Sequence, residues 1–203
     1  IYHGQVLSFT EIERIMNAEY KTEDGNPMVV SLCLIDSGDQ TDMVYDFCTY
    51  NAEWALPVKG SSHATQSNYK ISVINKTNSA AHGMRLVLVD GGSYKDAIAG
   101  RMRKPNGTGS WMVHKDCDME YAQQVTAEHK VSIKKGSQTV QTWIPKHSHA
   151  DNHYLDTEVY AFAAADILGA RTFGMEDEEQ KPNTKEEPST SEEQWIKTNE
   201  QWI

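Results

Sequence analysis

The sequence lacks the marks of membrane proteins, secreted proteins and several common enzyme classes. No apolar run approaches the roughly 20 residues that cross a bilayer. The first residues, Ile1-Tyr2-His3-Gly4-Gln5, are not the basic segment followed by an apolar one that makes a secretory signal. Neither a Gly-x-x-x-x-Gly-Lys-Ser/Thr phosphate loop nor a Gly-x-Ser-x-Gly nucleophile motif occurs. We therefore expect that this chain does not bind ATP and is not a serine hydrolase.

Cysteine is scarce as well. The three cysteines, Cys33, Cys48 and Cys117, are odd in number and widely spaced. No Cys-x-x-Cys pair occurs, so the sequence supports neither a zinc knuckle nor a disulfide framework. Cys33 lies in an apolar run, which is typical of a small core residue. The expected compartment is a reducing cytoplasm.

Positive charge is in short supply, and the formal net charge is −10. Such a balance argues against a protein that coats nucleic acid without specificity. The segment from Glu176 to Ile203 holds nine acidic residues and three lysines, a net charge of −6, which leaves −4 for the rest. This segment is also rich in polar residues and proline. We therefore expect one domain over residues 1–174 and an acidic tail over 175–203, flexible or docked on a partner.

The hydrophobic pattern predicts strands that alternate with helices. Two short apolar runs, residues 29–35 and 86–89, predict strands buried on both faces. Ser8 and Glu11 fit a capping box at the start of a helix over 9–20. The other expected elements are helices over 41–50 (capped by Thr41), 94–103, 119–128 and 151–168, strands over 55–60, 69–74 and 111–114, and a hairpin with strands 130–134 and 139–144. The alternation predicts an α/β sheet.

Asp36 directly follows the first apolar run. In open α/β sheets ligands bind at the carboxyl ends of the strands, so a carboxylate there can face a crevice. The alternative is an aspartate that starts a turn, which Asp36-Ser37-Gly38 also suits. Asp90 ends the second run in the same way, before Gly91-Gly92. It is a reserve metal ligand with the same alternative.

Asp156 lies early in the predicted helix over 151–168, beside its apolar stripe. The alanines that follow would let the helix approach a sheet closely, so Asp156 can meet a carboxylate from a strand end. The alternative is a first-turn aspartate that the helix dipole favours. His149 and His153 lie one or two turns earlier and are either helpers at the site or partly exposed structural histidines.

Together, Asp36 and Asp156 predict a catalytic metal site. Carboxylate oxygens select Mg²⁺ or Mn²⁺ rather than zinc. Two such ions, about 3.5–4 Å apart, can activate water and stabilise the leaving oxygen in phosphodiester cleavage. Lys59 and Lys95 are candidate contacts to DNA phosphates, and a solvated surface lysine is the alternative for each.

Three stretches, in this order along the chain, carry a resemblance to a known family. The first joins Leu34-Ile35-Asp36-Ser37-Gly38 and Val44-Tyr45-Asp46-Phe47-Cys48 with Lys59-Gly60. The second leads from Tyr94-Lys95-Asp96 to residues 121–128. The third, and most telling, is Asn152-His153-Tyr154-Leu155-Asp156 followed by residues 159–164. Together they resemble the lambda-like, GpA-type large terminases of tailed phages, over most of residues 1–170.

The resemblance implies a ribonuclease H-like mixed sheet flanked by helices, and an endonuclease that cuts concatemeric double-stranded viral DNA during packaging. It implies that Asp36 and Asp156 are acidic ligands of Mg²⁺ or Mn²⁺. It also implies the host bacterial cytoplasm, with the phage portal protein and the small terminase subunit as partners. The family has an earlier acidic residue upstream of the stretch that Ile1-Tyr2-His3-Gly4 resembles, and an ATPase half further upstream. We therefore expect this sequence to begin after both.

The end of the chain repeats Glu-Gln-Trp-Ile at 193–196 and 200–203. Because the repeats are seven residues apart, both tryptophans would share one face of a helix that docks on a partner. The alternative is a weakly structured tail. Two other functions remain open: a catalytically incomplete module that binds portal or terminase subunits, and a recombinase or transposase nuclease with the same chemistry.

Overall fold

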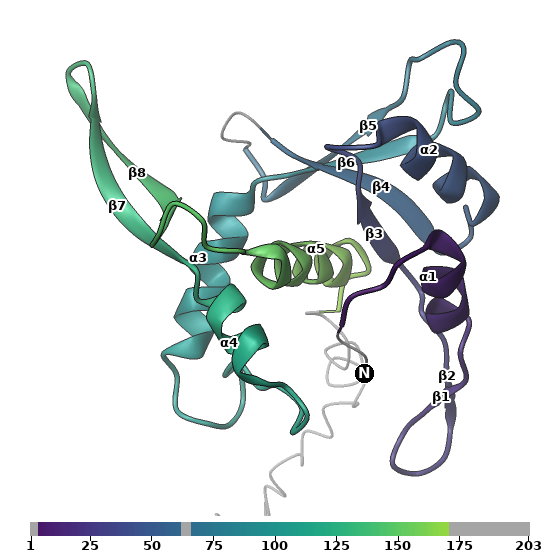
Figure 1. Cartoon of the computed structure of the whole chain (residues 1–203), viewed down its shortest axis with the longest axis horizontal. Coiled ribbons are helices and arrows are strands. Elements are labelled where there is room, and N and C mark those ends of the chain that lie inside the picture. Colours follow the sequence, from purple (N-terminus) through teal and green to yellow (C-terminus); the bar gives the residue numbers. More distant parts are fainter. Residues whose placement is uncertain (1–3, 62–65, 171–203) are drawn as a thin grey trace, which may run out of the picture. The chain divides into compact units, whose positions relative to one another are not determined.

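The computed structural model describes residues 4–61 and 66–170 (Figure 1). The chain divides after Ala170. The predicted boundary at residue 174, the acidic tail and its two repeats lie outside the described residues and stay predictions. Within the described ranges, no helix has both the length and the apolar character that a membrane crossing requires.

A four-stranded mixed sheet, in the order β3-β4-β6-β5, forms the centre of the fold. The strands β3 (Cys33–Asp36), β4 (Ala55–Gly60) and β6 (Arg85–Val89) run parallel, and β5 (Tyr69–Val73) pairs antiparallel with β6. Helices flank this sheet (Figure 1). The predicted α/β class, with a mixed sheet between helices, is confirmed.

The first strand is shorter and less buried than the sequence predicted. Residues 29–35 were expected to form a strand buried on both faces, but β3 begins at Cys33, and Val29 is 81% exposed. Among the described strands β3 has one neighbour, β4, so its apolar residues are only half-buried. A continuous apolar run does not distinguish an edge strand from a central one, and here the buried strands are the central β4 and β6.

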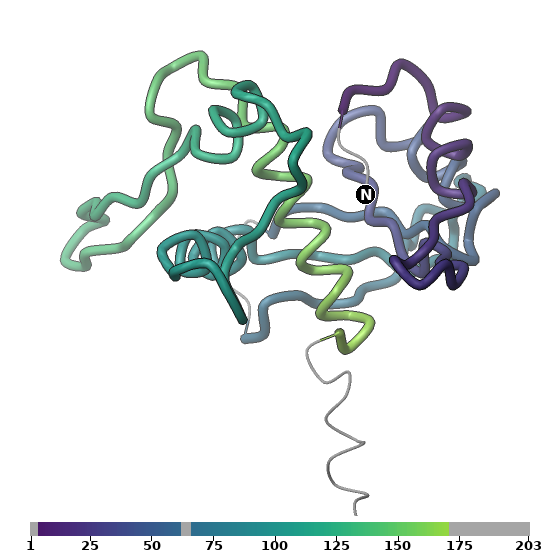
Figure 2. The backbone as a smooth tube through the Cα atoms, turned by 90° about the horizontal axis from the view of Figure 1, so that it is seen from below, coloured from purple at the N-terminus to yellow at the C-terminus, as the bar shows by residue number. Residues whose placement is uncertain are grey.

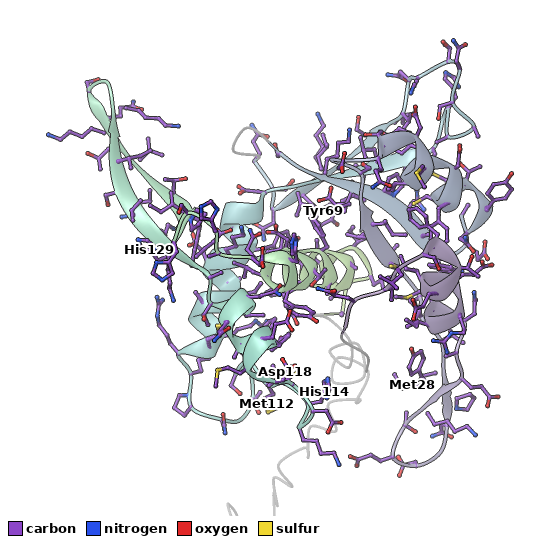
Figure 3. All side chains as sticks on the ribbon, viewed as in Figure 1. Met28, Tyr69, Met112, His114, Asp118 and His129 are labelled. Atoms are coloured by element: carbon purple, nitrogen blue, oxygen red, sulfur yellow. The ribbon has the colours of Figure 1, made fainter. Side chains whose placement is uncertain are left out.

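Alternate residues of the strands divide the core between the two faces of the sheet. On one face, Leu34 and the strand residues beside it pack against α3 and α5. On the other face, Cys33 and Ile35 pack against α1 and α2. Figure 2 shows α5 crossing the strands on its side, and Tyr69, labelled in Figure 3, packs with the same cluster. By this alternation Asp36, two residues after Leu34, belongs to the α5 side.

Two helices cover the opposite face. The first, α1 (Phe9–Met16), is capped by Ser8, whose Oγ accepts from the Glu11 backbone N–H. It ends at Met16 rather than at residue 20, because β1 (Tyr20–Lys21) pairs with β2 (Pro27–Met28) in a separate two-stranded sheet.

The second, α2 (Thr41–Tyr50), has the predicted bounds but not the predicted cap. Gln40 occupies the capping position with φ 45°. Thr41 instead donates its hydroxyl hydrogen to the Ser37 carbonyl.

The two helices α3 and α4 differ from the prediction at one or both ends. α3 (Gly91–Met102) starts three residues earlier, since Asp90 caps it, and α4 (Met119–Val125) is capped by Asp118 (Figure 3). α4 stops before residue 128 because that residue already belongs to the next strand. Residues 111–114 form no strand, so that prediction was wrong.

The hairpin and the last helix are confirmed. β7 (Glu128–Lys135) and β8 (Gln138–Pro145) pair along their full length around a tight turn in which Gly136 has φ 63°, a conformation that favours glycine. α5 (His153–Ile167) lies within the expected range of 151–168 and ends just before Gly169 at φ 69°.

Candidate functional site

Asp36 contacts a tyrosine of α5, Tyr160, that lies one helical turn after Asp156. Tyr160 of α5 donates its hydroxyl hydrogen to Asp36 Oδ2 over 3.1 Å. Asp156 lies one turn earlier on the same helix. The pKa of Tyr160 is raised, chiefly by burial, then by the charge and hydrogen bond of Asp36, and finally by the charge of Asp156. The hydroxyl therefore stays protonated and serves as a hydrogen-bond donor to Asp36.

The turn after β3 holds Asp36 in this position. Its Oδ1 accepts from the Gly38 backbone N–H at 2.8 Å, and Ser37 is fully buried and donates its hydroxyl hydrogen to the Val58 carbonyl at 2.9 Å. A side chain at residue 38 would place its Cβ only 3.2 Å from Asp36 Oδ1. The turn role and the site role are thus compatible, because one oxygen serves the turn and the other faces Tyr160.

A partly buried ion-pair network lies beside Asp156. Lys95 Nζ is 2.8 Å from Glu128 Oε1 and 3.2 Å from Asp156 Oδ1. The side chains of Lys95 and Glu128 are 13% and 6% exposed, whereas that of Asp156 is 40% exposed. Asn152 also donates to Glu128 Oε1 at 2.7 Å. Glu128 therefore fixes the lysine, and Asp156 is the member of the network that solvent and ligands can reach.

Sequence reasoning missed Glu128 as a member of the site. It was expected at the end of a helix, where a carboxylate is usually solvated, but it begins β7 and is nearly buried. The available signal was its place at the end of the second family-like stretch, residues 121–128. Nothing in local sequence indicated that Lys95, 33 residues earlier, would neutralise it.

An open cleft of about 650 Å³ lies over this network. Its walls are the start of α3, one side of the β7–β8 hairpin, and Asp156, Val159 and Tyr160 of α5. Asp90 also lines it, but its carboxylate caps α3 by accepting from the Ser93 N–H and hydroxyl at 3.2 and 3.0 Å. Asp90 is thus a helix cap rather than the turn residue given as its alternative, while Asp36 borders the cleft only through Tyr160.

The remaining candidates are placed differently from one another. Lys95 lines the cleft, but two carboxylates hold it. Lys59 points to the α2 side, 6.0 Å from the centre of the Tyr45 ring, and is not part of the cleft wall. His149 and His153 are exposed outside the cleft. The fold therefore pairs Lys95 with Asp156 and places Asp36 against Tyr160, whereas Lys59, His149 and His153 lie outside the cleft wall.

The comparison with known families identifies the kind of domain. A family model described as terminase large subunit gpA, endonuclease domain, matches residues 3–179. The chain belongs to this family. It is thus a nuclease-family domain of phage DNA packaging, with DNA as the implied substrate, as the three sequence stretches indicated. Nothing among the curated proteins or the solved structures matches the chain.

The carboxylates of the candidate site suit a hard divalent cation. Asp36 and Asp156 offer carboxylate oxygens, which Mg²⁺ and Mn²⁺ prefer. Residues 4–61 and 66–170 contain no group of three or more His, Cys, Asp or Glu side chains arranged for a metal ion. Mg²⁺ is commonly held by one or two carboxylates, with water and substrate phosphate completing its shell. Two carboxylates beside an open cleft meet that requirement.

Proposed function

We propose that this domain cleaves concatemeric double-stranded DNA during phage packaging, with Mg²⁺ or Mn²⁺ held by Asp36 and Asp156 on a ribonuclease H-like sheet. The observation that carries the proposal is the Tyr160 hydroxyl, which donates a hydrogen bond to Asp36 and whose pKa is raised in part by the charge of Asp156. The family supports a nuclease, and the cleft beside Asp156 offers a place for a DNA backbone. The expected setting is the packaging motor in the host bacterial cytoplasm.

The cation would supply a Lewis acid at the scissile phosphate and lower the pKa of bound water. The chain's own residues prepare the place for it. Tyr160 orients Asp36 toward α5, so that the strand-end and helix carboxylates act from fixed positions. Lys95, held in place by its ion pair with Glu128, offsets part of the negative charge of the carboxylates that would otherwise repel a DNA phosphate. We keep Lys95 as the proposed phosphate contact; the position of Lys59 gives no support for the same role.

Nicking of a supercoiled plasmid in Mn²⁺ tests the proposal. We expect Asp36→Asn and Asp156→Asn each to lower the nicking rate by on the order of 100-fold, since each removes a ligand charge while keeping the side-chain shape. Asp42→Asn is the matched control, because it makes the same change at an exposed α2 residue paired with Lys76. Nicking by the two site variants at the rate of the control would reject the assignment.

A second candidate is a non-cutting module of the packaging motor that binds the portal protein or the small terminase subunit. The specific observation in its favour is that residues 4–61 and 66–170 contain no group of three or more His, Cys, Asp or Glu side chains that could hold a metal ion. Calorimetry with Mn²⁺ separates the candidates. A nuclease site binds Mn²⁺ in a manner that depends on Asp36, whereas heat release that is absent, or unchanged in Asp36→Asn, supports the module.

A further inference from the structure

The β7–β8 hairpin carries a charge opposite to that of the chain. Residues 128–145 contain three lysines, and their single acidic residue is Glu128 at the base of the hairpin, in a chain whose net charge is −10. Among the described carboxylates, Asp96 pairs with Lys130, and none pairs with Lys134 or Lys135. The outer half of the hairpin is therefore a local source of positive potential.

The hairpin is built to stand out from the domain rather than to pack on it. None of its residues is buried, and Figure 1 shows its turn projecting away from the sheet and helices. An isolated two-stranded hairpin is marginally stable, so its base must hold it. Asp96 of α3 accepts from Lys130 Nζ at 2.7 Å and from Trp143 Nε1 at 3.1 Å, and Lys146 N–H donates to the Ala127 carbonyl at 2.8 Å.

One face of the hairpin continues the wall of the cleft. By strand alternation, Lys130, Ser132 and Lys134 of β7 share a face with Thr139, Gln141 and Trp143 of β8. Lys130, Gln141 and Trp143 line the cleft together with Asp156 and Tyr160. Lys134 extends the same polar face roughly 13 Å beyond Lys130, at about 3.3 Å per residue.

These features suit a duplex DNA that runs out of the cleft. A two-stranded ribbon fits the DNA major groove, which is about 12 Å wide, and unpaired lysines gain from replacing the counterions of phosphates. We propose that the β7–β8 hairpin is a DNA-holding arm, in which Lys134, on the face that continues the cleft wall, and Lys135, on the opposite face beside the turn, contact the phosphates of the duplex next to the stretch that enters the cleft. The choice of DNA over an acidic protein rests on the proposed nuclease function.

Binding of a labelled duplex of arbitrary sequence, followed by fluorescence anisotropy in EDTA, tests the arm without cleavage. We expect Lys134→Ala/Lys135→Ala to weaken binding on the order of tenfold near 200 mM salt, and to reduce the slope of log K against log salt by about two. Lys21→Ala/Lys115→Ala is the matched control, since it removes the same charge from two exposed lysines outside the hairpin. Its affinity should stay within about twofold of the parent chain. Melting followed by circular dichroism verifies that both variants are folded.

Equal affinity and salt slope in the hairpin and control variants would overturn the arm, which includes the case of a hairpin that binds an acidic protein instead. Plasmid nicking by Asp36→Asn in Mn²⁺, measured alongside, keeps this outcome distinct from failure of the nuclease proposal. If Asp36→Asn nicks plasmid normally while the hairpin variant loses DNA binding, the metal assignment fails and the arm stands.

Discussion

The two faces of the central sheet differ in what their buried titratable groups do. On the α2 side, burial raises the pKa of the Cys33 thiol to about 11, and burial with the charge of Cys33 raises that of Cys48 to about 12. Both thiols stay protonated and act as apolar packing groups. On the α5 side, burial raises the pKa of Tyr160, but its hydroxyl faces a carboxylate.

The contrast teaches that burial alone does not make a site. On both faces desolvation holds a titratable group neutral. On the α5 side the neutral group, Tyr160, is a hydrogen-bond donor. The ion pair of Lys95 and Glu128 lines the same open cleft as Tyr160. Substitutions on the α2 side should therefore cost stability, while those on the α5 side should also alter metal binding.

The largest expected effect on stability comes from Phe47→Ala on the α2 side. Phe47 is 8% exposed, stacks on Phe9 and meets Trp54 edge-on. Its loss should lower the free energy of unfolding by about 3–5 kcal/mol, as measured by urea denaturation. The folded fraction should bind Mn²⁺ with the parent affinity. A loss below about 1 kcal/mol would mean that this face is not the packed core described.

A smaller effect is expected from Glu128→Gln, which leaves Lys95 with Asp156 as its carboxylate partner. We expect the free energy of unfolding to fall by about 2 kcal/mol, less than the roughly 3–5 kcal/mol that a fully uncompensated buried charge costs. Glu120→Gln, an exposed residue that accepts from Gln124, is the control. Mn²⁺ affinity should change in Glu128→Gln and not in the control. An unchanged urea midpoint would show that the Lys95–Glu128 pair contributes no net stability.

The smallest effect is expected from Tyr160→Phe, about 1 kcal/mol near pH 8, because one hydrogen bond to an exposed carboxylate is lost. The folded-state pKa of Tyr160 is raised above 10.0. The stability linked to its proton is therefore fully present below about pH 10 and is lost as the pH rises above that value.

The difference in urea midpoint between the parent chain and Tyr160→Phe should thus shrink as the pH rises from about 10 to 11. Tyr121, whose pKa is raised as well, is common to both proteins and cancels from the comparison. A difference that stays constant over this range would contradict the buried position of Tyr160 against Asp36.

The sequence predicted those parts of the fold that local pattern controls. The strand over 55–60, the hairpin and the last helix follow from turn residues, alternation and a glycine stop. The edge position of β3 could not be predicted, since strand order depends on pairing between distant segments. Residues 111–114 were predicted to form a strand from their apolar pattern. They form none because no strand in the described part of the chain pairs with them.

The candidate site followed the same division. Position along a strand and a helix was enough to nominate Asp36 and Asp156, because strand ends and helix faces have predictable directions. The partners that fix them, Tyr160 and the Lys95–Glu128 pair, were beyond local pattern, since each contact joins residues 33 or more positions apart. Asp90 shows that a strand-end position does not by itself define a site residue. It stands at a strand end as Asp36 does, but its carboxylate caps α3.

A double-mutant cycle in Mn²⁺ affinity, measured by calorimetry on the parent chain, Asp36→Asn, Asp156→Asn and the double variant, tests most directly whether the two acids serve one ion. Each single variant should bind Mn²⁺ more weakly, and the double variant should lose little more, with a coupling energy of about 1–3 kcal/mol. Strictly additive losses, or single variants that bind Mn²⁺ as tightly as the parent chain, would contradict a shared site.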